Sequence, residues 1–139
     1  MQDCIFCKIV AGEIPSCKVY EDEHTIAFMD IGPLVKGHTL VIPKEHYDPF
    51  TAAPTEILTA CMQTVKRVMQ ALQKSLDTQG VNLHQANGAA AGQVVPHLHF
   101  HVVPRFADDG HHWNWNPKSY ASPEAMQKMA NRIKEYVVA

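Results

Sequence analysis

The sequence has no long apolar run and no excess of charge of one sign. None of its apolar stretches approaches the roughly 20 residues needed to cross a bilayer, so we expect no membrane partner. Lys and Arg number 12 and Asp and Glu 14, which gives a net charge of −2, and the basic residues do not cluster. A nucleic acid is therefore not an expected partner. The first residues lack the charged-then-apolar pattern of a secretory signal, which predicts a cytoplasmic protein.

Cysteine is scarce, with four residues in 139. In a reducing cytoplasm they should not form a disulfide framework. Cys61 falls on the apolar face of a predicted helix, which predicts a buried and inert thiol. Only Cys4 and Cys7 have a spacing with chemical meaning. C-x-x-C is half of a tetrahedral zinc site, although the spacing by itself is a weak signal.

The chain is long enough for one domain with a buried core. Apolar residues at helical spacing run from Pro54 to Leu76, and Gly80 then supplies a stop. A second helix has Ser122 as its N-cap and an apolar face that ends at Val137. A short helical turn is predicted over 5–11, and strands over 18–21, 25–30, 38–43, 81–86 and 97–104. This order of elements favours an α+β fold with an antiparallel sheet of five strands.

The strongest chemical signal is the run His-Leu-His-Phe-His-Val-Val at 97–103. Alternate residues of a strand share a face, so the three histidines should lie together while Leu98, Phe100 and Val102 point into the core. A lone histidine in a strand is usually structural, but three on one face with an apolar face behind them indicate a site. Imidazole, with an unperturbed pKa of about 6.5, suits the roles of nucleophile, base and acid at neutral pH.

A loop of small residues, 87–92, directly precedes this strand. Its glycines and alanines allow backbone N–H groups to approach a ligand closely, as in loops that bind phosphate oxygens. Gln93 adds a neutral donor. Most such loops are only turns, but its position before the histidines predicts an anion site.

Residues 92–105 resemble the signature of the histidine triad (HIT) superfamily, in which three histidines alternate with apolar residues. The resemblance is closest to the Hint-like branch and extends to residues 4–9, 12–15, 27–31 and 37–46. It implies a HIT-like antiparallel sheet with one long central helix and a C-terminal helix, in a homodimer. It also implies a single HIT domain over 1–139, with a core over 1–105 and a C-terminal extension with a helix over 106–139.

The same resemblance implies a hydrolase or transferase, such as a nucleoside phosphoramidase, acting at the α-phosphate of purine nucleotides of the AMP or GMP type. His99 would be the nucleophile that forms a nucleotidyl-histidine intermediate, and His101 would bind the phosphate or the leaving group. His38 would support the triad, Asp30 would accept from the ribose hydroxyls, and Gln93 would complete the catalytic set.

The other implied substrate contacts fall into two groups. The apolar walls around the base are Ile5, Phe6, Ile9, Phe28, Ile31 and Leu40, and the loop contacts are Asn87, Gly92 and Val94. On pattern alone the six apolar residues would be assigned to the core.

Two residues depart from the Hint pattern. Val94 stands where such enzymes commonly carry a serine that handles the leaving-group proton, and Ala86 stands where an amide side chain is frequent. Losing one such donor costs on the order of a hundredfold in rate, so we expect modest turnover.

By resemblance, His46 and His97 complete a zinc site with Cys4 and Cys7. Four protein ligands leave no open position for water, so the zinc would be structural, and no organic cofactor is expected. His97 would then take no direct part in catalysis. The remaining histidines, His24, His84, His111 and His112, are predicted to be surface residues.

Three other functions compete with this one. A dinucleoside polyphosphate hydrolase of the Fhit type would use the same chemistry on a longer substrate. A metallohydrolase would use His97 and His99 as ligands of a catalytic metal. A purine-nucleotide sensor would bind with little or no catalysis, as the departures at Val94 and Ala86 allow. Trp113 and Trp115 either cap a core edge or, by resemblance, reach a partner's site.

Overall fold

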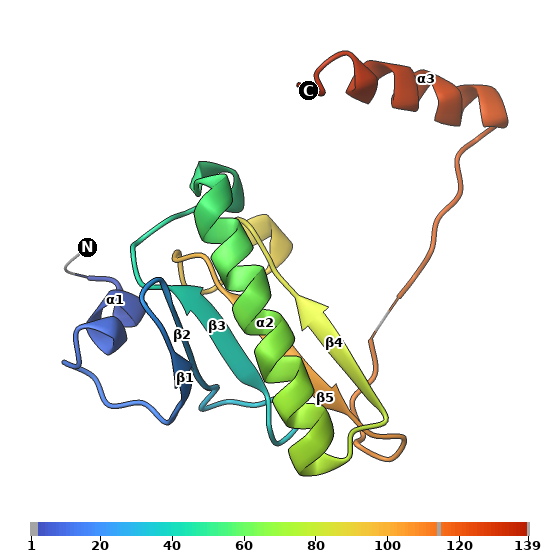
Figure 1. Cartoon of the computed structure of the whole chain (residues 1–139). Helices are drawn as coiled ribbons and strands as arrows, with labels where there is room; N and C mark the ends of the chain where they lie inside the picture. Colours follow the sequence, from blue (N-terminus) through green and yellow to red (C-terminus); the bar gives the residue numbers. More distant parts are fainter. Residues whose placement is uncertain (1–2, 114, 139) are drawn as a thin grey trace.

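The computed structural model describes residues 3–113 and 115–138 and contains one sheet and three α-helices (Figure 1). The elements in chain order are α1 (Ile5–Val10), β1 (Lys18–Glu21), β2 (Thr25–Met29), β3 (Thr39–Pro43), α2 (Thr55–Leu76), β4 (Gly80–His84), β5 (Phe100–Arg105) and α3 (Pro123–Lys134). Short 3-10 turns cover Phe50–Ala52 and Ala89–Ala91. The predicted α+β class is confirmed.

The five strands lie in the order β1-β2-β3-β5-β4, and each pair is antiparallel. The register pairs Phe28 with Leu40, Leu40 with His101, and His101 with His84. Directly paired residues point to the same face of a sheet, so these four side chains form a row across one face.

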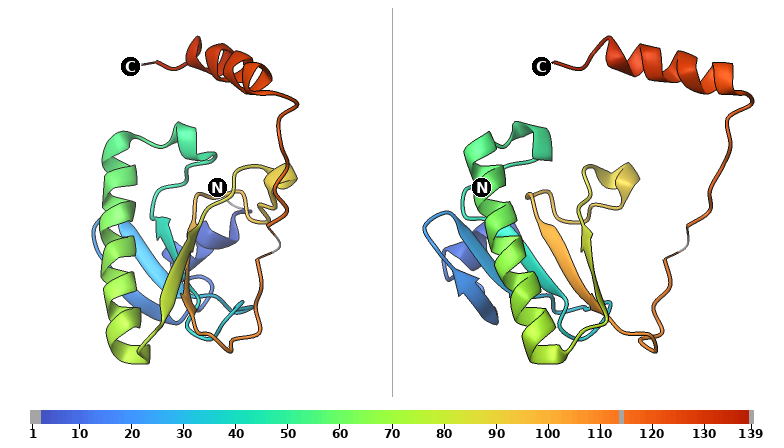
Figure 2. Two further views of the ribbon diagram at one scale, coloured as in Figure 1. Left: turned by 90° about the vertical axis from the view of Figure 1, so that its right-hand side faces the viewer. Right: turned by 45° about the vertical axis from the view of Figure 1, so that its right-hand side comes forward.

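The opposite face of the sheet packs against α2, which runs along it in Figure 2. This core joins sheet residues Ala27, Val41, Phe100 and Val102 to helix residues Cys61, Val65, Val68 and Leu72. A buried hydrogen bond of 2.6 Å between the hydroxyls of Thr25 and Thr64 also links β2 to α2. The face that carries the row packs against α1 through Phe6 and Ile9.

Most predicted boundaries differ from the observed ones by one to three residues, and two of the differences have a clear physical reason. The α2 helix is capped by Asp77 in the left-handed conformation (φ 52°), not stopped by Gly80, which is the first residue of β4. The last strand begins at Phe100 and not at His97. The reason lies in the backbone: the His97 N–H donates to the Val95 carbonyl and the Leu98 N–H to the Tyr47 carbonyl, outside the β-ladder.

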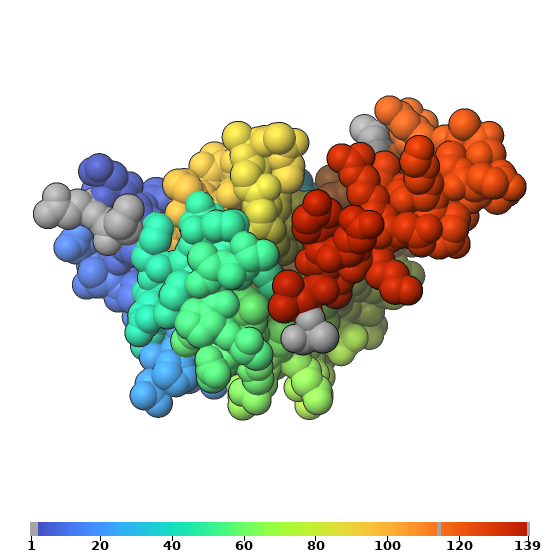
Figure 3. Space-filling view, turned by 90° about the horizontal axis from the view of Figure 1, so that it is seen from above, coloured from blue at the N-terminus to red at the C-terminus, as the bar shows by residue number. Residues whose placement is uncertain are grey.

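The helix α3 begins at its predicted cap, with Ser122 Oγ accepting from the Ala125 N–H. It lies apart from the sheet at the end of an extended segment (Figures 1 and 2), and Figure 3 shows this C-terminal part (orange to red) reaching out to one side. Its predicted apolar face is exposed, at Met126, Met129, Ile133 and Val137. In the described part of the chain, no helix combines the length and apolar character needed to cross a membrane.

Gly37 lies in a tightly packed part of the fold. Its φ is +104°, and an added Cβ would lie 2.8 Å from Leu76 Cδ1 and 2.9 Å from Pro104 Cγ. Gly12 has φ +79° but open space around the same position. We expect Gly37→Ala to lower the free energy of unfolding by about 3 kcal/mol, and Gly12→Ala by about 1 kcal/mol, since only the first adds a steric clash to the backbone strain. Urea unfolding measures both, and equal losses would contradict the packing described.

Candidate active site and metal centre

The three histidines of the 97–101 segment separate into two sites. The His97 ring is fully buried and lies against Cys4 and Cys7, whereas His99 and His101 line a cavity on the α1 face of the sheet. The separation arises because residues 97–99 precede β5, so their side chains need not alternate between two faces as they would in a strand.

His99 is held in one tautomer. Its side chain is 8% exposed, and its Nδ1 lies 2.6 Å from the His97 carbonyl oxygen. A carbonyl only accepts, so Nδ1 carries the hydrogen and Nε2 keeps its lone pair. Burial lowers the pKa of His99, which keeps the ring neutral at pH 7. A neutral imidazole with a free Nε2 is the form that can act as a nucleophile.

His101 is held in the opposite tautomer by a chain of hydrogen bonds. The Leu34 N–H donates to His38 Nδ1 (3.1 Å), so the hydrogen of the neutral His38 ring lies on Nε2. His38 Nε2 donates to His101 Nδ1 (2.8 Å), which leaves the hydrogen of His101 on its Nε2. Burial and the neighbouring His99 lower the pKa of His101 to about 4, and burial lowers the pKa of His38. His101 therefore offers an N–H donor beside the lone pair of His99, with the two rings 4.9 Å apart.

Asp30 lies next to His38, the central ring of this chain of hydrogen bonds. Its Oδ2 is 3.5 Å from His38 Nε2, and its Oδ1 accepts from the Gly32 N–H at 2.8 Å. The carboxylate raises the pKa of His38, but burial lowers it by more, so the net shift is downward. Asp30 also lines the cavity, where its oxygens can accept further hydrogen bonds.

The cavity has a volume of about 800 Å³, a size that suits a ligand such as a nucleotide. It is apolar at one end and carries histidines at the other. Of the residues implied as walls or loop contacts, it is lined by Ile5, Phe6, Ile9, Phe28, Ile31, Leu40, Gly92 and Val94, together with Gln93. Ile5, Ile31 and Val94 are exposed, whereas Phe6, Ile9, Phe28 and Leu40 also belong to the α1 core.

The loop before the histidines is held largely by its own hydrogen bonds. The N–H groups of Ala91, Gly92 and Gln93 donate to loop carbonyls, and that of Gly88 donates to Gln93 Oε1. The Gln93 amide donates to Asp48 Oδ1 and to the Val95 carbonyl. These N–H groups are therefore already paired, whereas the Val94 N–H has no partner among the described residues.

Asn87 is turned away from the cavity. Its Oδ1 accepts from the Phe50 N–H (2.8 Å) and from Gln85 Nε2 (3.0 Å), and Asn87 is not among the residues that line the cavity. Ala86 does line it and carries no polar group there.

His84 is a cavity residue that the sequence did not indicate. It was predicted as a surface residue and is indeed exposed, but it lines the cavity beside His101. The available signal was its place in a predicted strand of alternating residues, but the register that pairs it with His101 is not visible in the sequence.

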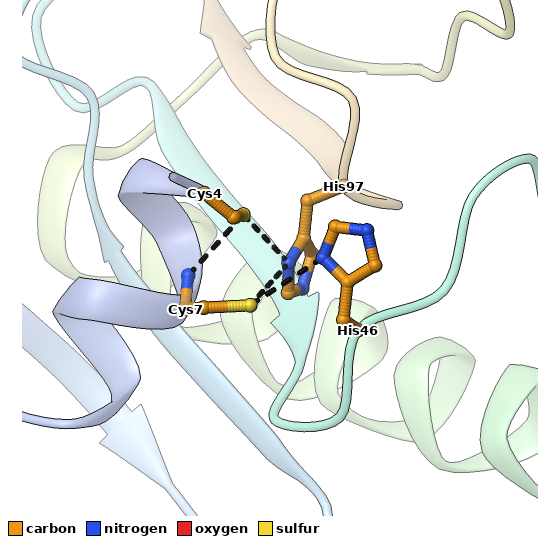
Figure 4. Close-up of side chains that lie close together, drawn as sticks. All are labelled: Cys4, Cys7, His46 and His97. Carbon is orange, nitrogen blue, oxygen red and sulfur yellow. Dashed lines mark hydrogen bonds between the residues drawn. The ribbon is translucent and has the colours of Figure 1, made fainter. Parts of the chain in front are cut away.

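A second cluster joins Cys4, Cys7, His46 and His97, whose side chains point toward one another in Figure 4. Cys4 and Cys7 come from the start of α1, where Cys4 Sγ also accepts from the Cys7 N–H. His46 follows β3, and His97 precedes β5. The sequence-predicted ligands are therefore brought together.

The geometry of this cluster fits a tetrahedral metal ion. The sulfur–nitrogen distances are 3.3 Å (Cys4 to His97), 3.4 Å (Cys7 to His46) and 3.6 Å (Cys7 to His97). Bond lengths of about 2.3 Å for Zn–S and 2.0 Å for Zn–N require an S–N edge of about 3.5 Å. His97 Nε2 donates to the Pro43 carbonyl (3.0 Å), so its Nδ1 lone pair faces the sulfurs. Burial lowers the pKa of His97 to about 4, which keeps that lone pair free.

The chain is similar to a known protein family over most of its length. A model of the HIT domain matches residues 11–108. The chain belongs to the HIT family. A HIT protein from Bacillus subtilis has a crystal structure with a TM-score of 0.90 and 40% identity, covering 99% of both chains. The adenosine 5'-monophosphoramidase of Saccharomyces cerevisiae is 46% identical over 73% of this chain and 62% of its own.

A zinc-bound HIT protein from Mycobacterium smegmatis is also similar, with a TM-score of 0.76 and 34% identity over 98% of this chain and 99% of that one. The metal alternative in which His97 and His99 share one ion finds no support in the geometry. His97 Nδ1 faces the cysteines, and His99 Nδ1 is bound to a carbonyl.

We predict that the cysteine–histidine cluster binds zinc. The purified protein should contain about one zinc ion per chain, and Cys7→Ala should remove it and lower the melting temperature, because bound metal stabilises only the folded state. Cys17→Ala, at an exposed cysteine outside the cluster, is the matched control. Elemental analysis and thermal unfolding measure both effects. Retention of zinc by Cys7→Ala would refute the site.

Proposed function

We propose that this HIT protein hydrolyses or transfers purine nucleotides at the α-phosphate, as a nucleoside phosphoramidase does, through a nucleotidyl intermediate on His99. The observation that carries the proposal is the pair of opposite tautomers: the lone pair of His99 Nε2 lies beside the N–H of His101 in one cavity. A nucleophile and a donor side by side can split one displacement at phosphorus into two easier steps.

In the first step, His99 Nε2 bonds to phosphorus, the bond to the leaving group breaks, and its electron pair departs with that group. In the second, water attacks phosphorus, the electrons of the Nε2–P bond return to His99, and the proton that water loses replaces the one taken up by the leaving group. His101 Nε2–H and the unpaired Val94 N–H are the proposed donors to the phosphate oxygens. Gln93 has a positioning role in this proposal, since its amide holds the loop.

The proposed nucleotide orientation follows the polarity of the cavity. In this orientation the purine base packs among the apolar residues of the cavity, which include Phe28 and Leu40. The ribose hydroxyls donate to Asp30. Asn87 supports the loop from outside the cavity. The names of two relatives support the substrate class: the yeast adenosine 5'-monophosphoramidase and an adenylylsulfatase of Arabidopsis thaliana that is 43% identical over 74% of this chain and 52% of its own.

Zinc has a structural role in this proposal. Its four ligands come from three parts of the chain, so the ion would fix α1 and the 97–99 segment to the sheet. Burial raises the pKa of the Cys7 thiol, so a bound cation would favour its thiolate form. Free thiols persist in a reducing compartment. The cytoplasm is the compartment that we propose.

His99→Ala should abolish hydrolysis of an adenosine 5'-phosphoramidate, a loss of at least about 10³-fold, because it removes the lone pair that attacks phosphorus. Acid-quenched wild-type protein should carry an adenylyl group on His99, detected by mass spectrometry. His24→Ala, distant and exposed, is the control. Equal rates in wild type and His99→Ala would refute the enzyme, and AMP binding without turnover would favour a nucleotide sensor.

We also propose that the protein is a homodimer. Among the described residues no strand pairs with the outer edge of β4, and α3 carries an exposed apolar face away from its own sheet. A second copy is the partner that covers both by symmetry.

Light scattering should give about twice the 15.5 kDa mass of one chain. Ile133→Glu, on the apolar face of α3, should weaken the dimer, whereas Lys128→Glu on its other side should not. A monomer in the wild type at micromolar concentration would contradict the proposal.

A further inference from the structure

His84 brings an additional imidazole to the cavity from the edge strand β4. It pairs directly with His101 across the sheet, and the two ring centroids are 5.6 Å apart. The ring is exposed and lines the cavity, and its nitrogens have no hydrogen-bond partner among the described residues. Its ring nitrogens are thus available to a bound ligand.

The His84 ring is also held in place from outside the cavity. The Trp113 ring lies against it in a tilted arrangement, with centroids 5.7 Å apart and an interplanar angle of 30°. Trp113 Nε1 donates to Asn82 Oδ1 (2.8 Å), an oxygen that also accepts from Arg105 Nη1 (2.8 Å). Arg105 in turn forms a bidentate pair with Asp109. This chain of contacts fixes the tryptophan, and the tryptophan limits the motion of the imidazole.

The rings lie in the order His99, His101, His84. The first two centroids are 4.9 Å apart and the second pair 5.6 Å. In a displacement at phosphorus, the leaving atom departs opposite the attacking atom. A phosphate attacked by His99 and bound by His101 therefore has its leaving group on the side of His84.

We propose that His84 is a catalytic residue that protonates the leaving group. This inference rests on the proposed phosphoramidase function. It assigns to His84 the task for which Val94, 89% exposed at the cavity, offers no hydroxyl. The substrate class that needs this residue has an amine leaving group, which departs as a neutral molecule only after gaining a proton.

The protons balance over the two steps. As His99 Nε2 bonds to phosphorus, the P–N bond breaks, its electrons stay on nitrogen, and the His84 imidazolium gives that nitrogen a proton. His84 is then neutral. When water attacks phosphorus, its proton passes to His84, and the electrons of the Nε2–P bond return to His99. Both histidines are restored to their starting forms.

Two substrates with the same nucleotide test the proposal. One is an adenosine 5'-phosphoramidate of an alkyl amine, and the other is an aryl ester of AMP, whose leaving group departs as a stable anion and needs no acid. His84→Leu should lower kcat/KM for the amine substrate on the order of 10²-fold and for the aryl ester by less than about threefold. His24→Leu, at an exposed histidine that does not line the cavity, should leave both rates unchanged. Equal effects on both substrates, or none, would overturn the proposal.

A binding measurement separates this proposal from the phosphoramidase function. In the His99→Ala background, which leaves the substrate intact, His84→Leu should weaken binding of the alkyl phosphoramidate about three- to tenfold and leave adenosine binding unchanged. His84→Gln keeps a donor but has no acidic proton, so in the His99→Ala background it should bind as His84 does. With His99 present, it should be as slow as His84→Leu on the amine substrate. If wild type cleaves neither substrate, the proposed function fails while this difference in affinity still tests the His84 contact. Equal affinity for the alkyl phosphoramidate with His84 and with His84→Leu would overturn the His84 proposal, whether or not the wild type is active.

Discussion

The structure depends on how one residue, His97, divides its bonds between two sites. The ring places Nδ1 against two cysteines and Nε2 against the Pro43 carbonyl, and it is fully buried. The carbonyl of the same residue accepts from His99 Nδ1. Anything that holds the His97 ring therefore also holds the carbonyl that sets the tautomer of the nucleophile. A metal ion among the cysteines would lock this arrangement without taking part in the chemistry.

The second constraint is the antiparallel register of the sheet. Because β3 and β4 both pair with β5, residues that are distant in the sequence lie in one row with His101. Leu40 lies on one side of His101 and His84 on the other. The row passes from an apolar end that suits a base to a polar end that suits a phosphate and its leaving group. The α2 helix buries the opposite face, so the row stays fixed while its outer surface remains open to a ligand.

Much of this could be predicted from the sequence, and the failures have physical causes. Helical spacing and the Ser122 cap defined α2 and α3, and alternation located all five strands. The break before Phe100 was hidden because His97 and His99 continue the alternating pattern, although the His97 N–H donates to Val95 within a turn and the Leu98 N–H donates to Tyr47. His84 was missed because a register is a tertiary property. The internal hydrogen bonds of Gln93 and Asn87 were equally invisible, since an amide in a loop has many possible partners.

The chemistry proposed for the cavity depends most on the opposite tautomers of His99 and His101. A long-range ¹H–¹⁵N correlation spectrum of the imidazole rings at pH 7 observes them directly, since protonated and unprotonated ring nitrogens resonate far apart. We predict that His99 carries its hydrogen on Nδ1 and His101 on Nε2, with both rings neutral because burial lowers both pKa values. A hydrogen on His99 Nε2, or a doubly protonated His99, would leave no lone pair for attack and would contradict the account.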